Sequence, residues 1–338
     1  MRRSYLKLLY NSTDITADIA GDVKSFRYSA SASENADTID VALADPDKKW
    51  LREWMPEAGD ELTAAIVLED YPTEGETRTV QCGKYILDEP SYSAPPHVQT
   101  LSAISVACNT SLVSAARSRT WTDAAVSEIA AQIASENGIS LYWESEYDPH
   151  ITMEQSKTAD LDFLAQLCKK YTLRLKAADG QLVIYDPFPR ESAAPVATLT
   201  EGGVEKYTLR HTYTGTGYTD AEITTVDADT GEYKMMADTA KYQGLTEEEA
   251  KKKYEKKLTA SAEGVEDDPE LAARTLKAEA MKEYTADVTT GIIPEITEGC
   301  AVTLSGFGAW DGAWIVDRMT VQLPGARTSL TLHKAVTS

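Results

Sequence analysis

The sequence has few basic residues, histidines and cysteines, and no long hydrophobic run. Among 338 residues, 33 basic residues stand against 54 acidic ones, a formal net charge of −21. This excess argues against binding to duplex nucleic acid or anionic lipid, because both depend on Lys and Arg. No apolar run approaches the ~20 residues of a membrane span, so we expect no membrane anchor. Polar Asn11–Asp14 interrupt the N-terminal segment, which therefore does not fit a secretory signal.

Cysteine and histidine are scattered as well as few. No two cysteines form the close pair of a zinc site or redox motif; they are Cys82, Cys108, Cys168 and Cys300. We expect reduced, mostly buried thiols in a chain made in the cytoplasm. No histidine has a partner at metal-ligand spacing, and no H-E-x-x-H motif occurs; the histidines are His97, His150, His211 and His333.

The motifs of common enzymes are also missing. There is no G-x-S-x-G elbow and no Walker A sequence, and the glycines at 215–217 and 306–308 fit turns rather than a dinucleotide site. Four aspartates miss the spacing of a calcium loop: Asp37, Asp40, Asp45 and Asp47. With 54 acidic residues, a carboxylate pair at glycosidase spacing has no diagnostic value. We therefore expect no catalytic, cofactor-binding or metal-binding residues and no cofactor, which favours a structural or binding protein over an enzyme.

Two tryptophans, Trp310 and Trp314, flank Gly312 near the end of the chain. Aromatic side chains carry large apolar surfaces and dominate many cores and interfaces. We favour packing within a β-barrel for this pair. A carbohydrate-binding platform is the alternative.

The first 110 residues show the alternation typical of β-strands. Ile39, Val41 and Leu43 recur at period two, as do the apolar residues of 62–68. Further strands are expected at 5–10, 77–89 and 98–106, with turns near 45–47, 56–60 and 93–96. Short strands separated by turn signals favour a barrel or sandwich.

Residues 115–186 change to an α+β pattern. Thr122 is a candidate N-cap for a helix whose apolar residues recur at helical spacing from Val126 to Ile133, and Gly138 fits its C-terminal stop. A second helix is expected from Thr158 or Asp160, followed by strands at 172–177 and 181–185. Asp179-Gly180 between these strands predicts a hairpin.

β patterns return after a proline-rich segment at 187–199. Strands are expected at 205–211, 220–227, 286–290, 301–304, 313–323 and 328–334. A capping box at Thr246–Glu249 predicts a helix over 246–258, whose thin apolar stripe places it outside. Asp268-Pro269 predicts a second helix over 269–284, whose stripe through Leu276 should pack on the barrel.

Four stretches of the chain, taken together and in order, match the pattern of one family. They are Tyr10–Thr16 with Asp37–Val41 and Asp45–Trp50; Pro56–Asp60 with Gly83–Glu89; Arg119–Trp121 with 129–138, Gln155-Ser156, Asp160–Leu164 and the 173–184 hairpin; and Glu298–Gly308 with Asp311–Val316. In these stretches the chain resembles the phage late-control gene D family, the baseplate hub proteins of contractile tails and related injection machines.

This resemblance implies a β-rich α+β fold with two tail-tube-like β-barrels and a small α+β domain inserted between them. Residues 1–112 would form the first barrel, 113–199 the inserted domain and linker, and 200–338 the second barrel with a two-helix excursion at about 246–284. The two barrels are expected to be related to each other. Three chains would then present six barrels to a six-fold tube and three-fold symmetry to a spike, which makes the hub a symmetry adapter.

The implied partners are two further copies of the chain, the tail tube or tube-initiator protein, a trimeric spike protein, other baseplate proteins and a tape-measure protein. The implied location is a virion tail baseplate or injection particle assembled in the host bacterial cytoplasm. DNA would pass through the channel without specific binding, and the acidic excess predicts a net-negative lumen that repels it. The alternative for the charge is a solubilising outer surface.

The chain also departs from the family pattern. Many relatives carry a histidine where Val321 and Gln322 stand here. We expect no fused spike or lysozyme-like domain after residue 338 and expect the spike to be a separate chain. The other functions that stay open are a tail-associated cell-wall hydrolase, a carbohydrate-binding tail component, and the hub of a bacteriocin rather than of a phage.

Overall fold

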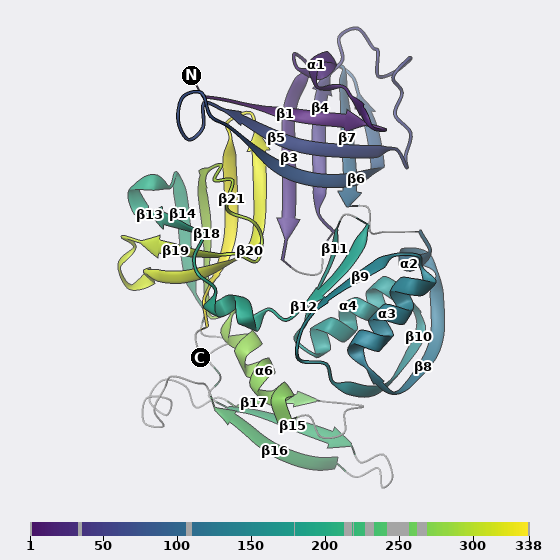
Figure 1. Cartoon of the computed structure of the whole chain (residues 1–338), viewed down its shortest axis with the longest axis vertical. Helices are drawn as coiled ribbons and strands as arrows, with labels where there is room; N and C mark the ends of the chain where they lie inside the picture. The colour runs from purple at the N-terminus through teal and green to yellow at the C-terminus, as the bar shows by residue number, and fades with distance from the viewer. Residues whose placement is uncertain are drawn as a thin grey trace.

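The computed structural model describes residues 2–32, 36–105, 110–178, 180–212, 218, 220–226, 233–241, 257–261 and 269–336. Figure 1 shows an N-terminal β block, a C-terminal β block and an α+β block beside them. Strands predominate among the described elements, so the prediction of a β-rich fold is confirmed.

Two strands of the N-terminal β block, at 38–44 and 98–105, bury every second side chain, whereas the strand at 61–69 buries five successive residues. In β4 (Thr38–Ala44) the buried residues are Ile39, Val41 and Leu43, the alternation seen in the sequence. The other elements of this block are β1 (Arg3–Tyr10), β2 (Thr13–Asp14), α1 (Thr16–Ile19), β3 (Val23–Ser31), β5 (Glu61–Glu69), β6 (Thr77–Ser93) and β7 (Val98–Ser105).

The C-terminal β block contains the expected strands with small shifts at their ends. Its elements are β13 (Ala197–Thr200), β14 (Lys206–His211), β18 (Tyr284–Gly291), β19 (Ala301–Ser305), β20 (Gly312–Leu323) and β21 (Arg327–Lys334), with short 3-10 turns η1 (Phe188–Ser192), η2 (Glu201–Gly203) and η3 (Gly308–Trp310). The glycines at 306–308 lie in the turn between β19 and β20, as predicted, and Gly306 and Gly308 have positive φ.

Strand β20 joins the two β blocks. Its first residues pair with β19, and from Arg318 to Leu323 it pairs with β3. The change of partner coincides with a bulge between Val316 and Arg318. The result is one 13-stranded sheet over one hydrophobic core that takes residues from both blocks. Because the strands of both blocks hydrogen-bond into this one sheet, two separate tail-tube barrels remain a prediction.

The α+β block has its own hydrophobic core. Helices α3 (Val126–Glu136) and α4 (Asp160–Lys170) lie between a three-stranded sheet and a two-stranded ribbon (Figure 1). The sheet consists of β9 (Ser140–Glu144), β11 (Arg174–Ala178) and β12 (Gln181–Tyr185), and the ribbon of β8 (Ala116–Ala125) and β10 (His150–Ala159); α2 (Thr110–Ser114) precedes β8.

The ends of these elements test the predicted caps and turns. Thr122 is not the N-cap of α3, because β8 continues to Ala125, and Asp148 accepts a hydrogen bond from the backbone N–H of Ser127 at 2.9 Å. Gly138 has φ +67° and ends the helix as predicted. Strands β11 and β12 form the predicted hairpin, with Asp179 outside the described residues.

The predicted helix over 246–258 lies mostly outside the described residues. Its last two positions, Lys257 and Leu258, were wrongly predicted as helical. They begin β17 (Lys257–Ser261), which pairs in parallel with β15 (Asp220–Val226), and β15 also pairs with β16 (Tyr233–Lys241). The cross-strand pairing explains the extended conformation at these two positions.

Helix α6 (Pro269–Ala280) begins as predicted but ends before Tyr284, which starts β18. The helix lies against β15 and β16. Leu271, Ala272 and Leu276 belong to the core of the α+β block, not to that of the β blocks, so the prediction that this helix packs on the barrel is wrong. Among the described residues, no helix has the length and apolarity to cross a bilayer.

A buried arginine explains the position of α6. The guanidinium of Arg274 lies 3.9 Å from the ring centroid of Tyr147, donates to Asp186 at 2.9 Å and donates to Thr172 at 3.0 Å. All three partners belong to the α+β block. An almost fully desolvated, paired guanidinium fixes both position and orientation, and it directs the apolar stripe of α6 toward that block.

We expect Leu276→Ala to lower the free energy of unfolding of the α+β block by about 2 kcal/mol or more, since it leaves a cavity in a packed core. Chemical denaturation followed by circular dichroism measures the change. Lys282→Ala, just beyond the helix and solvent-exposed, is the control and should change stability by less than about 0.5 kcal/mol. An equally small effect of Leu276→Ala would place its side chain outside the core.

Candidate functional site

The four aspartates considered for calcium do not come together. Asp40 accepts a hydrogen bond from Ser102 at 2.7 Å, and Asp45 accepts bonds from the backbone N–H groups of Lys49 and Trp50 in the turn that follows it. Asp37 pairs with a lysine of the α+β block, and Asp47 is exposed. Among the described residues, no cluster of His, Cys, Asp or Glu has the arrangement of a metal site.

The thiols and the tryptophans have packing roles. Cys82 and Cys168 are buried, and burial raises the pKa of each thiol to about 12, whereas Cys300 is half-buried and Cys108 lies outside the described residues. Trp314 is 0% exposed and donates from its indole N–H to the carbonyl of Trp310 at 3.0 Å. Trp314 therefore packs in the core, as the packing interpretation predicts, and Trp310 lies half-buried against the same core.

Three of the histidines lie far from one another, and each contacts a different residue. His97 contacts Tyr92, exposed His150 lies beside Asp123, and His211 stacks on Tyr284 at 4.3 Å between ring centroids. The glycines at 215–217 lie outside the described residues.

His333 is buried at the junction of the β blocks. Its Nδ1 lies 2.9 Å from Asp317 in the bulge of β20, and its Nε2 lies 2.9 Å from Glu191 in η1. Burial opposes the charged imidazolium, but the hydrogen bonds to Asp317 and Glu191 outweigh burial and raise the pKa of His333 to about 9. A charged His333 therefore connects β21 to the bulge of β20 through Asp317 and to η1 through Glu191.

A second ion cluster joins the α+β block to both β blocks. Lys176 of β11 lies 3.0 Å from Asp37, in the β3–β4 connection, and also pairs with Glu298, before β19. Burial opposes the charge on Lys176, but the two carboxylates raise its pKa. Ser105 at the end of β7 donates to the carbonyl of Ala177 at 2.7 Å, which adds a further link.

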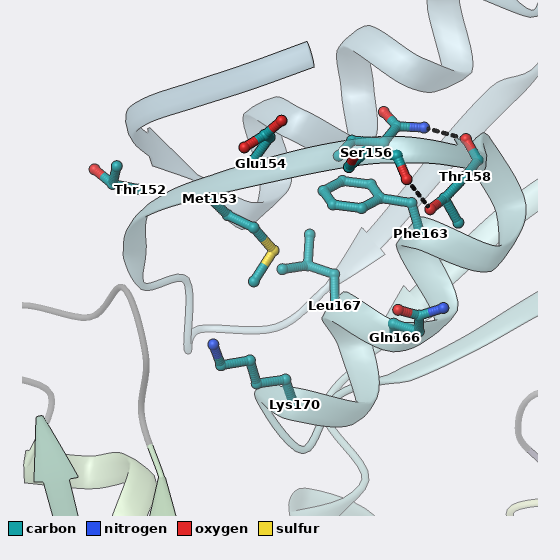
Figure 2. Close-up of a pocket in the computed structure, with 10 residues that line it drawn as sticks. Thr152, Met153, Glu154, Ser156, Thr158, Phe163, Gln166, Leu167 and Lys170 are labelled. Carbon is teal, nitrogen blue, oxygen red and sulfur yellow. Dashed lines mark hydrogen bonds between the residues drawn. The ribbon is translucent and has the colours of Figure 1, made fainter. Parts of the chain in front are cut away.

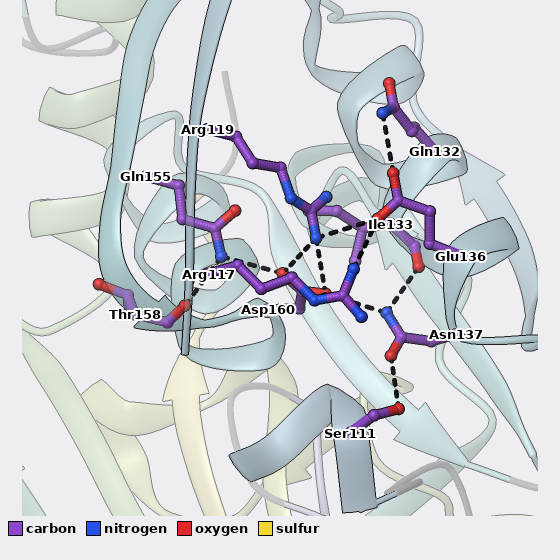
Figure 3. A network of polar contacts seen from close by, with 10 residues as sticks. All are labelled: Ser111, Arg117, Arg119, Gln132, Ile133, Glu136, Asn137, Gln155, Thr158 and Asp160. Atoms are coloured by element: carbon purple, nitrogen blue, oxygen red, sulfur yellow. Dashed lines mark hydrogen bonds and ion pairs between the residues drawn. The ribbon is translucent and has the colours of Figure 1, made fainter. Parts of the chain in front are cut away.

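A further polar network is centred on Asp160, the first residue of α4 (Figure 3). Asp160 is 0% exposed. It accepts hydrogen bonds from Arg119 at 2.9 Å, Gln155 at 2.9 Å and Asn137 at 3.0 Å, and the Nε of Arg117 lies 3.4 Å away. All its polar partners are donors. The negative charge of a carboxylate at a helix N-terminus is also stabilised by the helix dipole.

The network joins α4 to three other elements of the α+β block. Arg117 and Arg119 come from β8, Gln155 from β10 and Asn137 from the end of α3. Glu136 pairs with both arginines, at 2.8 Å and 3.1 Å, and so neutralises the second positive charge. The sequence predicted a helix start at Asp160 and placed Asp160, Arg119 and Gln155 in one stretch of the family resemblance, but it predicted no contact among them. The available signal was the pair of arginines at alternate positions of one strand.

A groove opens on the other side of this framework, between β10 and α4 (Figure 2). It has a volume of about 430 Å³. Phe163 and Leu167 are buried in its wall, and Met153 is half-buried opposite them. Its lining residues are Thr152–Ser156, Thr158, Phe163, Gln166, Leu167 and Lys170. Glu154, which is exposed, and Lys170 are the two titratable side chains of this lining.

No protein-family model and no curated protein matches the sequence. Solved structures do match. A tail protein from Neisseria meningitidis superposes with a TM-score of 0.66 at 14% identity, over 98% of this chain and 96% of that chain. A 43 kDa prophage MuSo2 tail protein from Shewanella oneidensis gives 0.64 at 14% identity, over 98% and 97%.

An Escherichia coli protein gives a TM-score of 0.56 at 11% identity, over 92% of this chain and 73% of that chain. It is described as a component of the type VI secretion system with structural similarity to the T4 bacteriophage tail proteins gp27 and gp5. The chain thus has the fold of phage-type tail proteins over nearly its whole length.

Proposed function

We propose that this protein is a structural component of a phage-type tail and serves as its baseplate hub, as the resemblance to the late-control gene D family implies. The observation that carries the proposal is a similarity of fold that extends over almost all of this chain and almost all of two tail proteins. All three blocks of the molecule are therefore part of the similarity.

We further propose the division into residues 1–112, 113–199 and 200–338, with related barrels in the first and last parts. In a trimer these parts form a ring with pseudo-six-fold symmetry on one side and three-fold symmetry on the other. Such a ring joins a six-fold tube to a trimeric spike. The proposed location is the baseplate of a tail or injection particle, with other baseplate proteins and a tape-measure protein as further partners.

The buried ion clusters fit a hub that must keep its parts in fixed positions. Lys176 connects the α+β block to both β blocks, and His333 connects β21 to the bulge of β20, where the two β blocks join. A buried ion pair stabilises one relative position of the two elements that carry it, because any other position leaves a desolvated ion without its partner. In this proposal the net charge of −21 lines a channel that DNA traverses without binding.

We expect the purified protein to be a homotrimer, alone or on addition of its trimeric spike protein. Multi-angle light scattering measures the mass, and three times the mass of the chain is the expected result. A monomer under both conditions would contradict the hub. Peptidoglycan release by the purified protein would instead support the cell-wall hydrolase, and binding of DNA at physiological salt would contradict the repelling channel.

A further inference from the structure

The groove between β10 and α4 touches an unbroken run of β10 residues. Thr152, Met153, Glu154, Gln155 and Ser156 all line it. The pairing of β10 with β8 is irregular at both ends of this run, between Ile151 and Met153 and between Gln155 and Thr158. The lining contains no residue of β8, so the cavity lies on the side of β10 that faces away from β8.

That edge of β10 has no strand beside it in the part of the chain that the structure describes. Its hydrogen-bonded partner is β8, and the two form a two-stranded ribbon. An edge strand presents main-chain N–H and C=O groups to whatever lies beside it. At about 3.3 Å per residue, Thr152–Ser156 offer an edge of roughly 13 Å, enough for four or five residues of a paired strand.

The opposite wall of the groove is one face of helix α4. Phe163, Gln166, Leu167 and Lys170 are spaced three and four residues apart and so lie on the same face. Phe163 and Leu167, with Met153 across from them, form an apolar floor. Gln166 stands exposed at the rim.

Hydrogen bonds to Asp160 fix the distance between β10 and α4, the two walls of the groove. Gln155 of β10 donates to Asp160 at the start of α4 and to the carbonyl of Thr158, each at 2.9 Å. Arg119 of β8 also holds Asp160. The groove is therefore preformed, which reduces the entropy lost when a ligand binds.

We propose that this groove binds an extended peptide segment of another protein, which adds to β10 as a third strand and places an apolar side chain between Met153, Phe163 and Leu167. The strand edge selects an extended main chain, because only that conformation satisfies successive edge groups. The alternation of side chains then allows one residue into the apolar floor and leaves its neighbours in solvent. The proposal does not depend on the tail function.

The test uses a ribosome-displayed library of random decapeptides, selected on the full chain and on Gln166→Trp. The indole at position 166 fills the groove from its exposed rim without removing a buried residue. Lys169→Trp, exposed on the same helix outside the groove lining, is the matched control. We expect peptides with alternating apolar residues to bind the wild type and Lys169→Trp equally and Gln166→Trp at least about tenfold more weakly, a loss of 1.4 kcal/mol.

The strongest selected peptide is then synthesised with N-methyl groups on alternate amides. This change removes main-chain donors and keeps the side chains, so binding by strand addition should fall by about tenfold or more. Equal binding of the N-methylated peptide would overturn strand addition and leave a side-chain pocket. Selection of no peptide, or of peptides that bind Gln166→Trp as well as the wild type, would overturn the site.

Discussion

Replacing Asp160 with alanine is expected to lower the free energy of unfolding of the α+β block by about 3–5 kcal/mol. The carboxylate is fully buried and accepts bonds from Arg119, Gln155 and Asn137. Without it, the Gln155 and Asn137 amides each lose one of two acceptors and keep only a backbone carbonyl, and Arg119 keeps only its pair with Glu136. The loss of stability comes from buried donors that lose an acceptor, rather than from the net contribution of the ion pair to folding.

Asp160→Asn separates charge from shape in the same place. Asparagine has nearly the same size, but it replaces one acceptor oxygen by an N–H₂ group that would face donors on every side. We therefore expect Asp160→Asn to be destabilising as well, by more than about 1 kcal/mol. Asp162→Asn, exposed in the same first turn of α4, is the matched control and should change stability by less than about 0.5 kcal/mol.

Hydrogen exchange measured by mass spectrometry locates the effect. In Asp160→Ala the backbone of α3, α4, β8 and β10 should exchange faster, while β4 and β7 keep their protection. The same protein should lose peptide binding in the groove, because the walls are no longer held apart at one distance. An unchanged rate of exchange in α4 would show that the polar network of Asp160 does not stabilise the α+β block.

The strands with one apolar face could be predicted from sequence, and those with a polar buried face could not. Alternation of Ile39, Val41 and Leu43 located β4 correctly. Strands β8 and β10 gave no such pattern, because Arg119 and Gln155 occupy inward positions that an ordinary strand would fill with apolar residues. The groove was missed for the same reason, since one of its walls is the edge of β10.

Local signals were also reliable only where local interactions decide the structure. Asp268-Pro269 correctly placed the start of α6, but the partner of its apolar stripe depends on Arg274 and its contacts 88 and 102 residues away in sequence. Nothing within one helix encodes such a partner. The pairing of β20 with β3, which makes a single sheet of the two β blocks, is non-local in the same way.

Raising the pH should weaken the junction of the β blocks through His333. Its pKa in the folded protein is about 9, above the ordinary value of about 6.5. A group with a raised folded pKa stabilises fully below its unfolded pKa and loses that contribution as the pH rises through the folded one. The contribution of His333 should therefore be complete at about pH 6 and should fall by roughly 3 kcal/mol by about pH 9.5.

The measurement is the difference in free energy of unfolding between wild type and His333→Gln at these two pH values. Glutamine can still hydrogen-bond to Asp317 and Glu191 but cannot carry the charge, and other titrating groups affect both proteins alike. The difference should shrink strongly between about pH 6 and about pH 9.5. His150→Gln, at an exposed position, should show no such change. A constant difference for His333→Gln would mean that the histidine is neutral in the fold and that Asp317 and Glu191 hold it only by uncharged hydrogen bonds.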